Sequence, residues 1–218
     1  MTDIPIWKLF IITYKMQLLI IAAILLATIA LQIYRTLILR SNLSSIIKKK
    51  QNSVDGLTGL LNAKTFRNMV RNHFVTVSDM STDALLIFDV DDMNSINEQQ
   101  GTYEGDKLLQ QFAGFLKSQF RDSDLIGRLT SDTFAVYMKN IHTEEFLHKK
   151  INQLFERKDF LRVSAGITIV NPRDSFVNNF AKAAQALELA KANGKNQFYI
   201  RENSSSYKSK GRNTSILS

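Results

Sequence analysis

An uninterrupted apolar segment near the N-terminus is the feature that most restricts how this chain can fold. No charged residue occurs between Met16 and Tyr34, and the stretch from Leu18 to Leu31 is almost purely apolar. A helix over the uncharged segment would span about 28 Å, close to the thickness of the hydrocarbon core of a bilayer. We therefore predict one N-terminal transmembrane helix, with residues 1–35 as a membrane anchor.

A cleaved signal peptide is the alternative, and it would need a shorter apolar core followed by small residues. The apolar segment is followed instead by Gln32-Ile33-Tyr34-Arg35, which is typical of a stop-transfer sequence. More basic residues follow the segment than precede it, which predicts a cytoplasmic C-terminal domain. The following ones are Arg35, Arg40, Lys48, Lys49 and Lys50, and the preceding ones are Lys8 and Lys15.

Residues 36–54 are expected to form a helical stalk or linker. Leu39, Leu43, Ile46 and Ile47 are spaced as on one face of a helix. Such a face could pair with a second copy of the chain, or it could rest on the membrane or on the following domain.

The composition limits the chemistry that the chain can perform. The chain has 218 residues and no cysteine, which excludes disulfides, thiolate catalysis and zinc held by cysteines. Its net charge of +8 is concentrated beside the apolar segment and in the C-terminal tail. This distribution favours an anionic membrane surface over nucleic acid, and no nucleic-acid partner is expected.

The remainder alternates between strand and helix patterns, which predicts an α+β fold, an α/β sandwich. We place a domain at residues 55–202 and a serine-rich, basic, disordered tail at 203–218. Strands are expected at 84–88, 125–129, 134–138, 163–170 and 198–200, and helices at 104–118, 144–156 and 176–192.

Four ordered motifs within this region resemble the GGDEF domain of diguanylate cyclases. They are Asp55–Asn62, the segment from Phe88 to Asp106 that includes Asn97 and Gly105, the turn Thr130–Phe134, and Ala190–Asn196. The resemblance implies a palm-like fold with a central, mostly antiparallel sheet flanked by helices. It also implies a bacterial protein of the inner (cytoplasmic) membrane that takes part in cyclic di-GMP signalling.

Joining two GTP molecules requires positioning and charge neutralisation, largely by Mg²⁺, which prefers oxygen ligands. The resemblance assigns Mg²⁺ to Asp89, to the backbone carbonyl of Val90 and to Asp132, with Asp132 also as the catalytic position. An alternative for Asp89 alone is the N-cap of a helix. His73, His142 and His148 show no ligand spacing and are expected to be surface or packing residues.

The nucleotide contacts follow from the same resemblance. Asn97 and Asp106 match the residues that read the guanine base, because an amide and a carboxylate together meet its donor and acceptor edge. Lys191 and Lys195 match positions that contact the triphosphate. Asn94 replaces a lysine that assists with phosphate in the family, so one positive charge is lost.

The turn that names the family is altered in this chain. Thr130 and Ser131 replace its two glycines, and Thr133 replaces its glutamate. A non-glycine residue forced into a conformation reserved for glycine costs about 1–3 kcal/mol. The lost glutamate removes a carboxylate that serves metal binding and catalysis. Both changes predict lost or very weak catalysis.

Arg121 and Asp124 keep the RxxD motif with which the family binds its product, cyclic di-GMP. An arginine can contact a guanine edge or a phosphate, and an aspartate can accept from guanine N–H groups. The alternative is an ordinary salt bridge between residues three apart.

The leading hypothesis is therefore a membrane-anchored, degenerate GGDEF protein that binds cyclic di-GMP at the RxxD motif. An active diguanylate cyclase is one alternative. A regulator that binds GTP without turnover and a scaffold that dimerises with itself or with another GGDEF protein are two others.

Overall fold

The computed structural model describes residues 6–76, 82–158, 160–201 and 207–209. The chain divides into two compact units, Met1–Asn52 and Ser53–Ser218, which are described separately.

The first unit is one long helix, α1 (Ile6–Gln51), which runs through the predicted anchor and stalk without a break. Within the described residues it holds one segment, Thr13–Ser44, that is long and apolar enough to cross a membrane. The hydroxyls of Thr28 and Thr36 donate to the carbonyls of Leu25 and Gln32 in the preceding turn. These bonds satisfy polar groups that an apolar surrounding would leave without partners.

The second unit is built on a seven-stranded sheet of order β1-β3-β4-β2-β5-β6-β7. Only β1–β3 and β5–β6 pair in parallel, so the sheet is mostly antiparallel, as predicted. The strands are β1 (Leu61–Asn62), β2 (Ala84–Val90), β3 (Leu125–Arg128), β4 (Thr133–Met138), β5 (Val163–Ile169), β6 (Phe198–Arg201) and β7 (Tyr207–Ser209). The helices are α2 (Ala63–Thr76), α3 (Met93–Gln100), α4 (Thr102–Gln119), α5 (Glu144–Arg157) and α6 (Phe176–Ala192).

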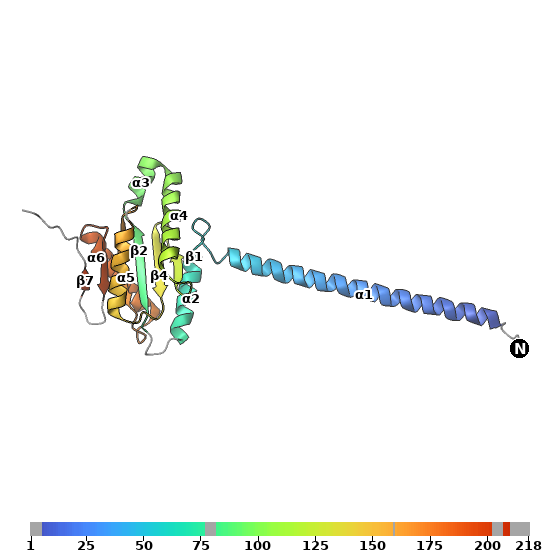
Figure 1. Cartoon of the computed structure of the whole chain (residues 1–218). Helices are drawn as coiled ribbons and strands as arrows, with labels where there is room; N and C mark the ends of the chain where they lie inside the picture. The colour runs from blue at the N-terminus through green and yellow to red at the C-terminus, as the bar shows by residue number, and fades with distance from the viewer. Residues whose placement is uncertain (1–5, 77–81, 159, 202–206, 210–218) are drawn as a thin grey trace, which may run out of the picture. The chain divides into compact units, whose positions relative to one another are not determined.

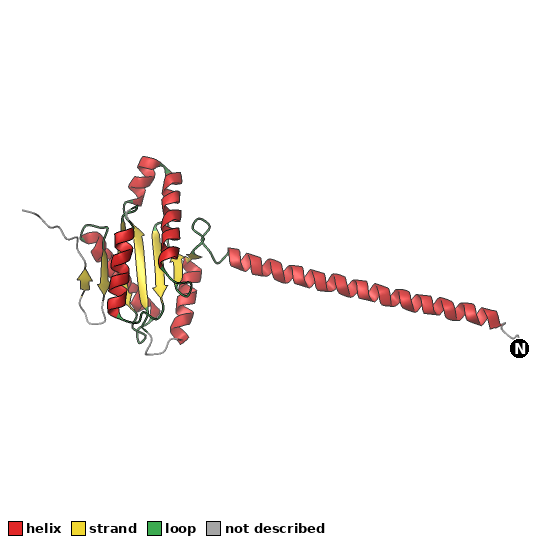
Figure 2. Ribbon diagram, viewed as in Figure 1, coloured by secondary structure: helices red, strands yellow, loops and turns green. Residues whose placement is uncertain are grey.

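Helices cover both faces of this sheet (Figure 2). Side chains of a strand alternate between the faces, so Leu86 and Phe88 of β2 pack with α4 and α5 (Figure 1), whereas Leu85 and Ile87 pack with α2 and α6. The two apolar layers confirm the α+β sandwich.

The helix predicted at 176–192 has the bounds of α6, and the strand predicted at 84–88 lies within β2. The elements β1, α2 and α3 were not predicted, because two are short and α2 is rich in basic and polar residues. The predicted tail at 203–218 lies mostly outside the described residues. Within it Tyr207–Ser209 forms β7 against β6 instead of being disordered.

Candidate functional site

The carboxylate of Asp89 is the centre of the candidate site. It lies near the end of β2, on the face that packs against α6. Its Oδ1 is 2.8 Å from Nζ of Lys191, and its Oδ2 accepts from the hydroxyl of Thr133 at 3.0 Å. Asp89 is not a helix N-cap, because that position of α3 belongs to Asp92.

The altered turn joins β3 to β4 and bonds to itself. The hydroxyl of Thr130 lies 3.1 Å from Asp132 Oδ1 and 2.8 Å from Thr133 Oγ1, and it can donate its one proton to either. The hydroxyl of Ser131 donates to the same Asp132 oxygen at 3.1 Å. The carbonyl of Asp132 accepts from the backbone N–H of Val90 at 3.1 Å, which holds the turn beside the end of β2. The turn thus carries Asp132 and Thr133 to the side of Asp89.

The backbone strain predicted for Thr130 and Ser131 is wrong. Neither residue has a positive φ. The turn reaches its shape in conformations open to any residue and uses the added hydroxyls as partners. The loss of the glycines therefore changes the chemistry of the turn without straining its backbone.

An arginine also holds the turn in place. Arg128 at the end of β3 donates to the carbonyl of Ser131 at 2.5 Å and to Asp55 Oδ1 at 3.1 Å. Burial raises the pKa of Asp55, but hydrogen bonds from Thr58 and the guanidinium of Arg128 outweigh burial and lower that pKa below its ordinary value. The first family motif and the altered turn are thereby tied together.

A second pair of acidic residues holds the segment after α6. Asp91 is buried; it accepts from the hydroxyl of Ser164 at 2.7 Å and from the backbone N–H of Asn196 at 2.8 Å. Lys195, in a left-handed conformation, places its Nζ 2.5 Å from Asp92 Oδ1. This hydrogen bond raises the pKa of Lys195 and lowers that of Asp92. Sequence reasoning missed Asp91, whose role depends on contacts distant in sequence.

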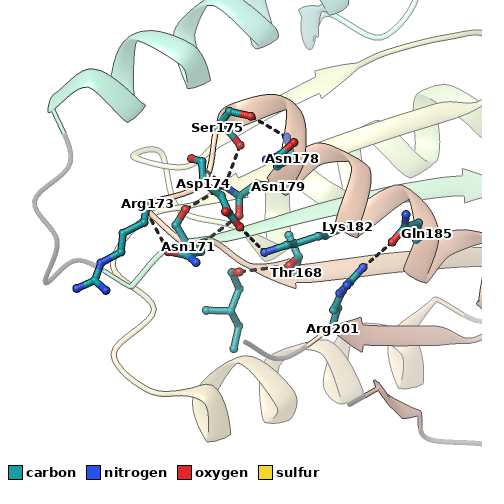
Figure 3. A network of polar contacts seen from close by, with 11 residues as sticks. Thr168, Asn171, Arg173, Asp174, Ser175, Asn178, Asn179, Lys182, Gln185 and Arg201 are labelled. Carbon is teal, nitrogen blue, oxygen red and sulfur yellow. Dashed lines mark hydrogen bonds and ion pairs between the residues drawn. The ribbon is translucent and has the colours of Figure 1, made fainter. Parts of the chain in front are cut away.

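The helix that supplies Lys191 is anchored at its other end by a polar network (Figure 3). The hydroxyl of Ser175 accepts from the backbone N–H of Asn178 at 3.1 Å and caps α6. The buried side chain of Asn179 accepts from the backbone N–H of Asn171 at 2.9 Å and donates to its carbonyl at 3.0 Å. Lys182 forms an ion pair with Asp174. These bonds hold α6 firmly, so Lys191 in its last turn has a defined position.

The predicted guanine-reading residues lie on α3 and α4, which extend beyond the ends of the central strands (Figure 1). Within the described residues, Oδ1 of Asn97 is buried and has no hydrogen-bond partner in the protein. A Cβ on Gly105 would lie 2.0 Å from that oxygen, so only glycine leaves it room. Asp106 follows on α4 and is half-buried. A buried acceptor without a partner is costly, which indicates a ligand position.

The RxxD motif forms a turn before β3. Both oxygens of Asp124 accept from backbone N–H groups, those of Arg121 at 3.0 Å and Lys139 at 3.1 Å. The exposed guanidinium of Arg121 lies 5.9 Å from the ring centre of Phe146. Asp124 therefore organises the turn through the backbone, and Arg121 presents its planar head group to the surface.

Lys150 on α5 adds a second cation to this surface. Burial and then the charge of Arg157 lower the pKa of the Lys150 ammonium, Asp124 opposes this, and Arg121 adds to it. Lys150 was missed by sequence reasoning, because no spacing links it to the motif. The two cations near Asp124 would suit an anionic ligand.

The carboxylates of the predicted Mg²⁺ site are already paired within the chain, which disfavours a resident ion. Asp89 and Asp132 supply two carboxylates and Val90 a carbonyl, but both oxygens of Asp89 and one of Asp132 already have partners within the chain. In the part of the chain that the structure describes, no three acidic or histidine side chains gather as a metal-binding group. Mg²⁺ at phosphate sites is usually held by one or two carboxylates with waters and substrate phosphates, so it is the ion pair of Asp89 with Lys191, and not the number of ligands, that disfavours the ion here. The assignment of Asp89, Val90 and Asp132 to a metal stays a prediction.

Comparisons with known proteins agree with the resemblance. The family model described as diguanylate cyclase, GGDEF domain, matches residues 52–197. The probable diguanylate cyclase DgcC of Escherichia coli K12 is 34% identical over 154 residues, covering 66% of this chain and 42% of that protein. The diguanylate cyclase of Vibrio cholerae O395 is 27% identical over 158 residues, covering 68% and 49%. The chain thus spans less than half the length of each of these relatives.

Among solved structures, the fold resembles the coiled coil and GGDEF domain of DgcB from Caulobacter crescentus, in complex with cyclic di-GMP. The TM-score is 0.69 at 20% identity, with 82% of this chain and 98% of that chain covered. At this identity the likeness shows the fold alone.

Proposed function

Because this chain belongs to the GGDEF family of cyclic di-GMP signalling domains, we propose that it is a membrane-anchored receptor for cyclic di-GMP. The ligand binds at the turn that contains Arg121 and Asp124. Catalysis is lost or very weak, because the altered turn between β3 and β4 lacks the carboxylate that Thr133 replaces.

The observation that carries this proposal is the contrast between the two motifs. At Asp124 the carboxylate shapes the turn and leaves the Arg121 guanidinium exposed, with Lys150 near it. At the altered turn the hydroxyl of Thr133 donates to Asp89, and the hydroxyl of Thr130 lies within bonding distance of both Asp132 and Thr133. The first motif is open to a ligand, whereas the second is satisfied internally.

Calorimetric titration of the purified full chain with cyclic di-GMP tests this proposal. Arg121→Ala should weaken binding by about ten- to hundredfold, the value of a lost charge-assisted hydrogen bond. Arg173→Ala, at an exposed arginine before α6, is the matched control and should bind as the parent does. Asp124 is unsuitable for this test, because its loss would collapse the turn. Unchanged binding in Arg121→Ala would refute the site.

We also propose a location for the protein, based on the apolar segment of α1. The apolar part of α1 would cross the bacterial inner membrane once, with the GGDEF domain in the cytoplasm, and the stalk could pair two copies or pair this chain with another GGDEF protein. The basic residues after the apolar segment support this orientation.

A second candidate function is guanine-nucleotide binding in the former active site. Asn97 favours it, because its buried oxygen has no partner in the described protein, and the absence of a Cβ on Gly105 leaves room for the Asn97 side chain in this position. With Asp106 on the adjacent helix, Lys191 paired with Asp89 and Lys195 paired with Asp92, GTP would be the ligand.

A residual cyclase activity is the enzymatic alternative. GGDEF diguanylate cyclases generally use Mg²⁺, which Asp89, the Val90 carbonyl and Asp132 would have to hold here. The contacts of Asp89 with Lys191 and Thr133 disfavour Mg²⁺ binding. Cyclic di-GMP formed from GTP and Mg²⁺, and abolished by Asp132→Ala, would establish the activity; its absence at high protein concentration would refute it.

A further inference from the structure

We propose that the former active site binds a guanine nucleotide without a divalent cation, because the ammonium group of Lys191 neutralises Asp89. The inference rests on the second candidate function, guanine-nucleotide binding at Asn97. What is new concerns how the phosphate groups of the nucleotide are bound.

The ion pair between Lys191 and Asp89 is close and partly shielded from water. Nζ of Lys191 lies 2.8 Å from Oδ1 of Asp89. The side chain of Lys191 is 31% exposed and that of Asp89 is 15% exposed. A divalent ion at Oδ1 would lie close to this ammonium, and the repulsion between the two positive charges would oppose its binding. The second oxygen, Oδ2, accepts from the hydroxyl of Thr133, so one of its lone pairs is already used within the chain.

The substitution at Thr133 also reduces the charge that a cation would need to balance. Asp89 and Asp132 carry two negative charges, and Lys191 supplies one positive charge. The former glutamate position carries only a hydroxyl, which donates to Asp89 where a carboxylate would repel it. The hydroxyls of Thr130 and Ser131 add two contacts to Asp132 Oδ1. The carboxylates are thus stabilised by groups of the chain itself.

The position of Lys191 is set by a rigid helix. α6 is capped by Ser175 and tied by Asn179 at its start. It also lies so close to β5 that a Cβ on Gly166 would be 2.1 Å from the backbone of Ala183 and Leu187. A lysine held in this way loses little conformational freedom when it binds a ligand.

The same ammonium can serve a polyphosphate. It has three N–H donors, and the contact with Asp89 uses one of them, so two can donate to phosphate oxygens. Lys195 places a second ammonium 2.5 Å from Asp92 just after α6. A nucleotide with its base at Asn97 and Asp106 would then find its phosphates opposite lysines, with Asp89 already neutralised.

Titration of the full chain in detergent micelles with GTP, once with Mg²⁺ and once with excess EDTA, tests the inference. The two affinities should be alike. Binding that appears only with Mg²⁺ would overturn the inference and leave the guanine site intact. The absence of GTP binding under both conditions would overturn the guanine site and this inference with it. Neither outcome bears on cyclic di-GMP at Arg121, which is titrated separately.

Two variants separate the role of Lys191 from a simple phosphate contact. Lys191→Met should weaken GTP binding in EDTA by about ten- to hundredfold, and Mg²⁺ should restore part of the loss, because Asp89 is then open to a cation. Thr133→Glu should make GTP binding depend on Mg²⁺. Lys64→Met, which removes an exposed lysine on α2, is the control and should change neither affinity. An equal loss in Lys191→Met with and without Mg²⁺ would contradict the proposed role.

Discussion

The hydroxyl of Thr133 changes what the carboxylate of Asp89 can do. In place of a second acidic group at this point, the chain has a donor 3.0 Å from Asp89, and that donor is in turn bonded to Thr130. Hydrogen bonds to a carboxylate are worth more than those between neutral groups. At the scale of single residues, the turn has exchanged acidic and flexible groups for stable internal bonds.

Asp55 is expected to stabilise the domain in a pH-dependent way. It receives bonds from Thr58 and Arg128, so Asp55→Asn should lower the free energy of unfolding by about 1–3 kcal/mol at neutral pH. Because the pKa of Asp55 in the fold lies below its ordinary value of 3.8, this contribution is present above pH 3.8 and is lost as the pH falls below it.

Chemical unfolding followed by near-ultraviolet circular dichroism measures this effect. The only tryptophan, Trp7, lies in α1, so its fluorescence would not report on the domain. The difference between parent and variant should narrow in acid. A difference that stays constant through this range would show that the carboxylate charge of Asp55 is not its source.

Tyr137 is a second residue whose contribution depends on pH. Its hydroxyl donates to the buried Asp83 at 2.8 Å, and burial together with that carboxylate raises the pKa of Tyr137 well above its ordinary 10.0. Tyr137→Phe should cost about 1–3 kcal/mol of stability below pH 10.0, and the cost should shrink above it, where the unfolded tyrosine ionises.

The control for this variant is Tyr103→Phe, at a side chain that is 71% exposed, and its stability should stay within about 0.5 kcal/mol of the parent. Urea unfolding below and above pH 10.0 measures the free energy of unfolding of both variants and of the parent. Equal losses in both variants would argue against the bond to Asp83 as the cause.

At the scale of elements, the contact between β5 and α6 decides where Lys191 lies. Gly166 faces the helix backbone, and its added Cβ would lie 2.1 Å from the carbonyl oxygen of Ala183. Backbone atoms of a helix cannot move singly, so the whole of α6 must shift. The pairing of Lys191 with Asp89 therefore depends on a glycine in a different element.

Gly166→Ala should destabilise the domain by about 1–3 kcal/mol and should also weaken GTP binding, since α6 carries Lys191. Gly114→Ala on α4 is the matched control. Among the described residues, no atom outside its own stretch of α4 lies within 4 Å of the added Cβ, and an alanine within a helix should raise stability by about 0.5–1 kcal/mol. Thermal unfolding and GTP titration of both variants give the comparison. A Gly166→Ala protein as stable as the parent would contradict the close contact.

At the scale of the whole molecule, α1 joins a membrane-length apolar segment to the GGDEF domain. The full chain should sediment with bacterial membranes and resist washing with high salt, because apolar insertion does not depend on ionic strength. Residues 53–218 alone should be found in the soluble fraction. Fractionation with antibody detection measures both. Release of the full chain by salt would show that the basic residues, and not the apolar segment, hold it to the membrane.

Much of the fold was predictable, because long apolar patterns report local structure directly. The bounds of α6 and the position of β2 follow from periodicity and from a continuous apolar run. β1 has two residues, and β7 exists only by pairing with β6, so neither carries a local signal. The family motifs identified the candidate residues, but they did not show which of these residues contact one another.

The sequence by itself determined an apolar segment of membrane-spanning length, the GGDEF family, and the replacement of an acidic, glycine-containing turn by hydroxyl groups. These are properties of neighbouring residues, and they can be read along the chain. Only the tertiary structure decided that Lys191 lies against Asp89, that Asp124 holds its turn through backbone N–H groups, and that Thr130 and Ser131 adopt unstrained conformations. Those outcomes depend on how β2, β4 and α6 pack together. The energy of a charge pair is set by how close the two groups lie in space, and their separation along the sequence does not determine this.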